Sequence, residues 1–314
     1  MDTSNADAIS IKIIPEIQMI HDVVKDNNIE FICLTEPLNP SGEMYSEEDF
    51  CELLRICKKY GCILILDKCQ RDELQIIKKD YYFSINKAIY EEGMMDNVVV
   101  INSLSKVRSI PGLRIGYVMA NEKIIDYIEY MNAITYWHCN SMCAFATAVD
   151  VLYQLVFLKP SNTKQYIGDF KEMFKYSLSS VYIAKKIFEY LNYNSIRDKS
   201  NRHCCEVIQR YDIIQKNYQL VKYYAVRNGY EITHLDGGFN FCLKIHSRYN
   251  EKELKNYASK VHRLELFTQE DFCCKNKCSN NYWVRISCAE FYESFKEKFD
   301  TFCEIIEGNQ RDNS

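Results

Sequence analysis

The stretch from Val98 to Lys106 constrains the fold of this chain more than any other. Its apolar run Val-Val-Val-Ile shows no alternation, which predicts a strand buried on both faces. Such strands are typical of parallel sheets, and α/β folds place their chemistry at the carboxyl ends of these strands. Lys106 follows the strand at that end. Ser103, Ser105 and Arg114 flank the lysine in the sequence.

This arrangement fits the chemistry of one cofactor. A lysine with a neutral amine forms a Schiff base with an aldehyde. Hydroxyl groups and a guanidinium together hold a phosphate dianion. An aldehyde and a phosphate in one molecule describe pyridoxal 5′-phosphate. The alternative for Lys106 is a surface lysine after a strand, but the serines, the arginine and the nearby glycines favour the functional interpretation.

Composition excludes several classes of protein. Lysine and arginine number 39 and aspartate and glutamate 43 in 314 residues, so the net charge of −4 offers no basic surface to nucleic acid or to an anionic membrane. The 15 cysteines are odd in number and scattered, which argues against a disulfide framework. Cys273, Cys274 and Cys278 lack a second pair of ligands, so we expect no zinc site. No apolar run is long enough to span a bilayer, and we expect a cytoplasmic protein.

Two further strands precede the lysine, and the second of them has a buried apolar run. A strand over 30–35 leads into the turn Asn39-Pro40-Ser41-Gly42, and a strand over 62–66 ends at Asp67. Between them, Ser46 has the spacing of a capping box and predicts a helix that ends at Gly61. Asn39 therefore lies in the turn after one strand and Asp67 at the end of the other, where either one, taken alone, would be an ordinary turn residue.

The remaining sequence predicts further elements with less chemical content. We expect strands at 9–14, 113–120, 230–235, 239–245 and 282–287, helices at 16–25, 121–133, 140–155, 171–192, 204–228, 250–261 and 290–306, and a loop over 158–170. Arg285 lies inside the last of these strands, where a charged side chain is costly unless it is paired.

These motifs, in this order, resemble those of the class I and II aminotransferases, which are fold-type-I pyridoxal-phosphate enzymes. The resemblance rests on Asn-Pro-Ser-Gly at Asn39, on Asp67, on Ser-x-Ser-Lys with Gly-Leu-Arg-Ile-Gly, and on Arg-Ile-Ser at Arg285. It implies an α/β fold, with a large, mostly parallel-sheet domain over residues 1–178 and a small α+β domain over 179–314. It also implies a homodimer that acts on an amino acid and a 2-oxo acid.

The resemblance also implies a role for each candidate residue. Lys106 would form the Schiff base and carry the proton, and Asp67 would pair with the pyridine nitrogen. The cofactor would further be bound by Asn39, Ser103, Ser105 and Arg114. Arg285, with Asn39 nearby, would bind the substrate carboxylate. Gln70 stands where relatives commonly have a tyrosine, so an amide would replace the phenol beside the cofactor.

The sequence leaves three alternatives open. The same lysine and aspartate would serve a lyase, a racemase or a cyclising enzyme. The 38 residues before Asn39 contain no glycine, whereas the family has a longer portion there with a phosphate-binding loop and a stacking ring. A shortened, catalytically impaired relative and a regulatory relative are therefore alternatives to an active enzyme. A nucleotide-binding α/β protein is disfavoured, because no glycine fingerprint follows a strand.

Overall fold

The computed structural model describes residues 10–70, 74–77, 83–135, 141–178, 193–272 and 280–307. The chain divides into two compact units, one formed by Met1–Asp72 with Asp212–Ser314 and the other by Glu73–Tyr211. The predicted domains, 1–178 and 179–314, follow the family and stay a prediction. The cysteine cluster at 273–278 and the predicted helix beyond residue 178 lie outside the described residues.

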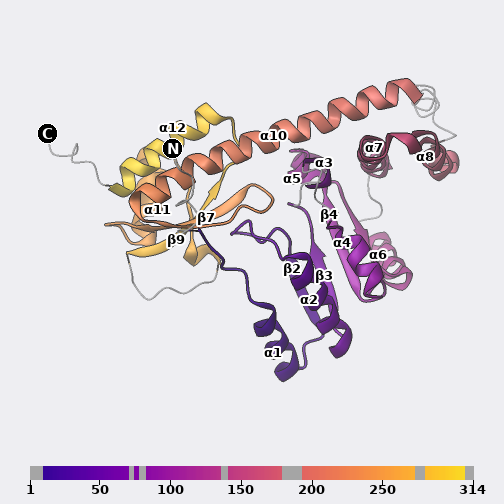
Figure 1. Ribbon diagram of the computed structural model, residues 1–314, viewed down its shortest axis with the longest axis horizontal. Helices are drawn as coiled ribbons and strands as arrows, with labels where there is room; N and C mark the ends of the chain where they lie inside the picture. The colour runs from indigo at the N-terminus through magenta and orange to yellow at the C-terminus, as the bar shows by residue number, and fades with distance from the viewer. Residues whose placement is uncertain are drawn as a thin grey trace. The chain divides into compact units, whose positions relative to one another are not determined.

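The first unit opens with two parallel strands and two helices. Strands β2 (Phe31–Thr35) and β3 (Ile63–Asp67) pair in parallel, as their apolar runs predict. Helices α1 (Ile17–Asn27) and α2 (Glu47–Tyr60) precede and separate them, and they lie at the bottom of Figure 1 with β2 and β3. The parallel pairing brings the carboxyl ends of both strands to the same edge.

The limits of α2 confirm the predicted capping signals. Ser46 is its N-cap, and its hydroxyl accepts a hydrogen bond from the Asp49 backbone N–H at 3.1 Å. Gly61 ends the helix in the left-handed conformation, with φ of 72°. Leu53, Leu54 and Cys57 are fully buried, so the predicted apolar face is the packed one.

A five-stranded sheet forms the larger part of the first unit. Its order is β1-β6-β7-β9-β8, with β1 parallel to β6 and the remaining neighbours antiparallel. The strands have the bounds β1 Ser10–Ile11, β6 Glu231–Thr233, β7 Asn240–His246, β8 Phe267–Thr268 and β9 Asn281–Ser287. The predicted first strand, over 9–14, is thus shorter than expected, and β8 is a strand that the sequence did not indicate.

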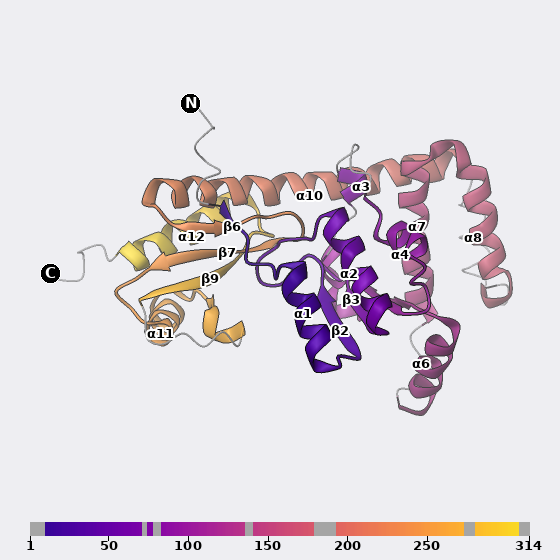
Figure 2. The same cartoon turned by 60° about the horizontal axis from the view of Figure 1, so that its bottom comes forward.

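Three helices pack on this sheet. They are α10 (Tyr193–Asn228), α11 (Glu251–His262) and α12 (Tyr292–Glu307). Figures 1 and 2 show α12 beside the end of α10 that belongs to the first unit, where the Tyr224 and Phe299 rings meet at 5.3 Å. The core takes every second side chain of β7 and β9, among them Phe241, Leu243, Tyr282 and Val284.

Strand period therefore assigns the other side chains of β7 and β9 to the opposite face of the sheet. Asn240 and Cys242 of β7, and Arg285 of β9, alternate with the core residues. Cys242 and Arg285 are direct neighbours in the β7–β9 register. This alternation places Arg285 away from the core formed with α10 and α12.

The second unit holds the lysine. Strands β4 (Val98–Ser103) and β5 (Gly116–Met119) pair antiparallel, with Ser103 opposite Gly116. The one-turn helix α5 (Leu104–Val107) and a 3₁₀ turn (Pro111–Leu113) connect them. The other helices are α3 Leu74–Ile77, α4 Ile85–Glu91, α6 Glu122–Thr135, α7 Ser141–Leu158, α8 Thr163–Leu178 and the first part of α10.

One sequence expectation in this unit is wrong. The loop over 158–170 is a short 3₁₀ turn, Pro160–Asn162, followed by α8, which begins at Thr163. Ile167, Phe170 and Phe174 recur at helical spacing and pack on Leu152 and Val156. The energy of burying this apolar face outweighs the turn propensity of Pro, Ser, Asn and Gly in the same stretch.

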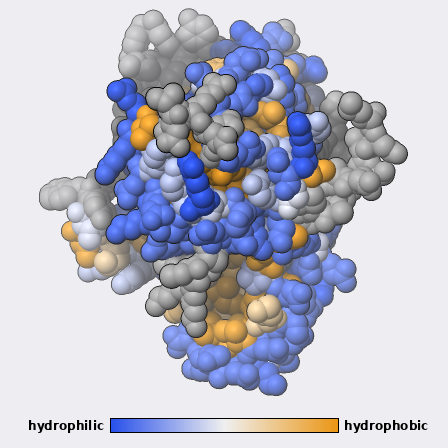
Figure 3. Space-filling view, turned by 90° about the vertical axis from the view of Figure 1, so that its left-hand side faces the viewer, coloured by the Kyte–Doolittle hydropathy of each residue, from blue (hydrophilic) through white to orange (hydrophobic). Residues whose placement is uncertain are grey.

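The surface seen in Figure 3 is mainly hydrophilic, with hydrophobic side chains gathered toward its lower end. In the first unit, α1 exposes Met19 and Val23, and β2 exposes Phe31. Among the described residues, no helix has the length and apolar content needed to cross a membrane. Every cysteine whose side chain the structure describes is a free thiol.

Candidate active site

Asn39 lies in the loop that follows β2. The loop is closed by two backbone hydrogen bonds, from Leu38 N–H to Glu43 O at 2.8 Å and from Gly42 N–H to Leu38 O at 2.7 Å. Gly42 has φ of 76°, and a Cβ on it would lie 2.1 Å from the Asn240 carbonyl oxygen. Only glycine fits there, so the loop is fixed against β7 while Asn39 remains exposed.

Asp67 is the last residue of β3 and lies opposite Thr35 of β2. Its Oδ1 accepts a hydrogen bond from the Cys69 backbone N–H at 2.8 Å, which orients the carboxylate. Burial, together with the hydrogen bond to Asp67 and its negative charge, raises the pKa of the Cys69 thiol to about 12. The thiol therefore stays protonated at neutral pH.

Gln70 is held by a contact from the five-stranded sheet. Its Oε1 accepts a hydrogen bond from Asn240 Nδ2 at 3.0 Å. A Cβ on Gly238 would lie 3.3 Å from the Gln70 carbonyl oxygen, so the turn before β7 also packs closely on this residue. Asn240 is only 4% exposed, and no sequence motif indicated its contact with Gln70.

Arg285 projects from β9 between aromatic rings. Its guanidinium carbon lies 4.3 Å from the centre of the Phe267 ring and 5.5 Å from that of Phe272. Nη1 donates a hydrogen bond to Asn39 Oδ1 at 3.3 Å. Burial lowers the pKa of Arg285, and neighbouring Cys242 and Asp271 oppose the shift.

The Nε–H of Arg285 is the feature of this group that indicates a ligand. It is buried and has no hydrogen-bond partner among the described residues. A buried N–H donor without an acceptor is costly. A carboxylate that pairs with the guanidinium fork supplies acceptor oxygens in the required geometry.

The lysine follows a serine that caps α5. Ser103 Oγ accepts a hydrogen bond from the Ser105 N–H at 3.0 Å, and lies 2.8 Å from Ser105 Oγ and 2.9 Å from the Ile115 carbonyl oxygen. Leu104 and Val107 are buried against Ile115, whereas Lys106 between them is exposed. The local packing therefore directs the amine outward.

Arg114 follows the 3₁₀ turn with φ of 51°, in the left-handed region. Its Nη1 donates to the Pro111 carbonyl oxygen at 3.3 Å, and its side chain is exposed. A guanidinium carries five N–H donors in a fixed fork, so this contact leaves donors for a further acceptor.

The predicted residues fall into two groups. Those of the first unit are Asn39, Asp67, Gln70 and Arg285, and those of the second unit are Ser103, Ser105, Lys106 and Arg114. Within the first group, Asn39 contacts Arg285. Within the second, Ser103 contacts Ser105.

Sequence reasoning missed an ion-pair network beside the lysine. Arg108, two residues after Lys106, binds the carboxylate of Asp150 with Nε at 2.5 Å and Nη2 at 3.1 Å. His203 Nε2 lies 2.9 Å from Asp150 Oδ1. The sequence held a signal, because Asp150 stands within an apolar helical run where a charge needs a partner.

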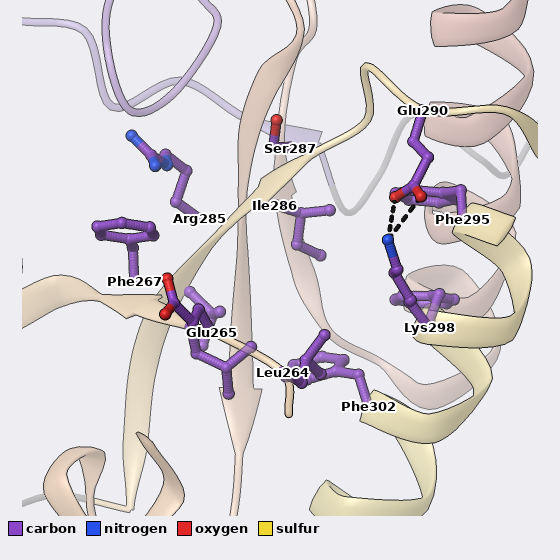
Figure 4. A pocket seen from close by; sticks show the side chains of 13 residues that line it. Leu264, Glu265, Phe267, Arg285, Ile286, Ser287, Glu290, Phe295, Lys298 and Phe302 are labelled. Carbon is purple, nitrogen blue, oxygen red and sulfur yellow. Dashed lines mark hydrogen bonds and ion pairs between the residues drawn. The ribbon is translucent and has the colours of Figure 1, made fainter. Parts of the chain in front are cut away.

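A cleft of about 180 Å³ lies in the first unit between β9 and α12. It is mainly apolar, and its lining includes Leu264, Phe267, Ile286, Phe295, Phe299 and Phe302. In Figure 4 the guanidinium of Arg285 points away from the phenylalanines of α12, and Lys298 donates to Glu290 at 2.5 Å. The cleft therefore adjoins the stem of Arg285, not its binding end.

Comparison with known proteins identifies relatives of this chain. The family described as aminotransferase class I and II matches residues 17–179. Histidinol-phosphate aminotransferase of Methanocaldococcus jannaschii is 26% identical over 133 residues, 42% of this chain and 32% of that protein. The adenosylcobalamin biosynthesis bifunctional protein CobDQ of Leptospira interrogans is 25% identical over 243 residues, 76% of this chain and 25% of that protein.

Solved structures extend the likeness to the fold. A PLP-dependent aminotransferase from Streptococcus suis 89-1591 matches with a TM-score of 0.62 at 15% identity, over 100% of this chain and 65% of that chain. This match confirms the expected fold-type-I α/β class. The chain thus spans about a third or less of these two curated relatives and just under two thirds of the solved one.

Proposed function

Because this chain belongs to the aminotransferase class I and II family, we propose that it is an aminotransferase that exchanges an amino group between an amino acid and a 2-oxo acid. The observation that carries the proposal is Arg285, whose buried Nε–H has no acceptor among the described residues and whose Nη1 contacts Asn39. A substrate carboxylate would satisfy this donor, which is the role that the family resemblance gives to Arg285.

Class I and II aminotransferases use pyridoxal 5′-phosphate, and the matching solved structure is also described as PLP-dependent. The donor set of this chain fits that group chemically. Lys106 offers an exposed amine and Asp67 an oriented carboxylate, whereas Ser103, Ser105 and Arg114 offer hydroxyls and a guanidinium for a phosphate. When bound, the cofactor supplies an aldehyde that captures amines and a pyridine ring that withdraws electrons from the substrate α-carbon.

Each candidate residue has a separate role in the proposed reaction. Arg285 binds the substrate carboxylate and, with Asn39, orients the α-carbon. Lys106 would remove the proton from the substrate α-carbon and deliver it to the carbon that had been the cofactor's aldehyde carbon, which requires a neutral amine. Asp67 would keep a proton on the pyridine nitrogen of the bound cofactor, because a nearby anion favours the cationic ring. Asn39 and Gln70 would donate amide hydrogen bonds to the phenolic oxygen of the bound cofactor.

The decisive experiment uses the full chain with added pyridoxal phosphate. The wild type should show visible imine absorption and transfer an amino group to a 2-oxo acid, and Lys106→Ala should lose both. Lys87→Ala is the matched control, because Lys87 is an exposed lysine of the same unit whose ion pair with Glu91 is at the surface. A wild type that stays colourless contradicts the proposal.

A second candidate keeps the cofactor and changes the reaction. The relative that aligns with the largest part of this chain, among the two reported, is named for cobalamin biosynthesis and not as an aminotransferase. We therefore also propose testing for lyase activity, measured as product release from an amino acid without any 2-oxo acid. Imine absorption without either activity supports the catalytically impaired alternative.

The resemblance further supports a cytoplasmic homodimer, which we propose on the family pattern. Sedimentation equilibrium of the full chain, with and without pyridoxal phosphate, measures the oligomeric state. A mass close to twice the chain's 37.1 kDa is the expected result, and a monomer at all concentrations contradicts it.

A further inference from the structure

The starting observation is that α5, which carries Lys106, has only four residues. A helix of one turn is unstable by itself, because its single turn cannot repay the cost of nucleation. Its position is therefore set by contacts with other parts of the second unit. Leu104 and Val107 supply an apolar contact with Ile115, but apolar contacts fix direction only weakly.

Hydrogen bonds hold α5 at both ends: at its start the Leu104 N–H donates to the Ile115 carbonyl oxygen at 3.2 Å, and at its C-terminal end the contacts reach two other helices. Arg108 is the C-cap residue of α5, and its two hydrogen bonds to Asp150 connect the helix to α7. The Val107 carbonyl oxygen also accepts a hydrogen bond from Arg210 Nη2 of α10 at 2.6 Å. A guanidinium fork that binds both oxygens of one carboxylate fixes orientation as well as distance.

Asp150 is itself held on several sides. Gln154 Nε2 donates to Oδ2 at 2.7 Å, and His203 lies against Oδ1. The side chains of Arg108 and Asp150 are 10% and 8% exposed. Burial alone would raise the pKa of Asp150, but its interactions with His203 and with the Arg108 guanidinium outweigh burial, so that the pKa is lowered. The carboxylate is therefore ionised and multiply bonded at neutral pH.

We propose that Asp150 is a positioning residue for Lys106, because it holds Arg108 and thereby fixes the one-turn helix that directs the lysine amine. Two residues apart on a helix means about 200° of rotation, so Arg108 and Lys106 point to different sides. The network thus acts on the backbone of α5 and does not touch the amine. The consequence for catalysis rests on the proposed function, whereas the consequence for α5 does not.

The test compares Asp150→Asn and Arg108→Lys with Asp169→Asn in the full chain. Asp150→Asn removes the charge that binds the fork, and Arg108→Lys keeps the charge but loses the two-point geometry. Asp169 is an exposed aspartate of α8 in the same unit and serves as the matched control. Because Arg108→Lys leaves both charges in place, it remains informative if Asp150→Asn does not fold.

The first readout needs no cofactor. Hydrogen exchange of the backbone amides of residues 104–109 should become roughly tenfold faster in both variants and stay unchanged in Asp169→Asn. The second readout is kinetic: kcat should fall on the order of 10- to 100-fold, while KM for the amino acid stays within about twofold, because Arg285 and Asn39 are not altered.

Unchanged exchange over residues 104–109 in Arg108→Lys overturns the proposal. A KM that rises as much as kcat falls also overturns it, because that result indicates general damage and not misplacement of the amine. If the wild type shows no turnover with pyridoxal phosphate, the proposed function fails, and the exchange experiment still decides the role of Asp150.

Discussion

Arg285 Nη1 donates a hydrogen bond to Asn39 Oδ1 at 3.3 Å, although 246 residues separate the two along the chain. The loop after β2 and strand β9 belong to the same unit, so the contact is part of its internal packing. The aromatic rings of Phe267 and Phe272 flank the guanidinium. This relationship joins the two residues to which the family resemblance gives the substrate carboxylate.

We expect Arg285→Lys to weaken substrate binding more than catalysis. An ammonium keeps the charge but cannot form two parallel hydrogen bonds to a carboxylate, which costs about 1.5–3 kcal/mol. KM for the amino acid should therefore rise roughly 10- to 100-fold with a smaller change in kcat. Steady-state kinetics measures both constants, and Trp283→Phe on the same strand is the control. A fall in kcat at unchanged KM would contradict this assignment.

Asp67→Asn should impair turnover without preventing folding. The amide can still accept the Cys69 N–H, but it carries no negative charge to favour a protonated pyridine nitrogen. Loss of such an electrostatic stabiliser costs on the order of 100-fold or more in kcat. Asp26→Asn, at an exposed position of α1, is the matched control. Equal turnover by the two variants would remove Asp67 from the site.

Gly42→Ala should lower the free energy of unfolding by at least about 2 kcal/mol. The left-handed φ of 76° disfavours any side chain, and the new Cβ would lie 2.1 Å from the Asn240 carbonyl oxygen. Gly168→Ala in α8 has open space around it and should instead stabilise by about 0.5–1 kcal/mol. Urea unfolding curves of both variants test the pair, and similar losses would show that the loop around Gly42 adapts.

Glu43 should make stability depend on pH in a defined direction. It is fully buried and accepts hydrogen bonds from the Ile13 N–H, and burial raises its pKa above 4.5 despite these bonds. Between 4.5 and the raised pKa, the folded chain binds more protons than the unfolded chain, so this contribution to stability falls as pH rises.

Glu43→Gln stays uncharged and should lack that decline. The free energy of unfolding of Glu43→Gln should therefore equal that of the wild type at low pH. Above the raised pKa of Glu43, the variant should have the higher free energy of unfolding. Glu265→Gln, an exposed substitution in the same unit, should follow the wild-type curve. A wild type whose stability rises through this range relative to Glu43→Gln would show that ionised Glu43 is stabilising.

Much of the fold could be predicted wherever a local rule decides the conformation. Ser46 and Gly61 bound α2 as their capping chemistry requires, and Asp67 ends a strand whose apolar run is visible in the sequence. The prediction of a loop over 158–170 was wrong. Ile167, Phe170 and Phe174 stabilise a helix there, but only because they pack on α7. The free energy of this packing depends on the presence of α7 and cannot be read from residues 158–170 alone.

The sequence by itself determined the order of motifs, the strand before Lys106 and the residue types suited to a phosphate, an amine and a carboxylate. Only the tertiary structure decided that Arg285 contacts Asn39 with an Nε–H that has no acceptor among the described residues, and that Asp150, which His203 also contacts, binds Arg108 close to the lysine in the chain. The reason is physical. Propensity and periodicity act over a few residues, whereas ion pairs and buried donors depend on which distant segments fold against each other.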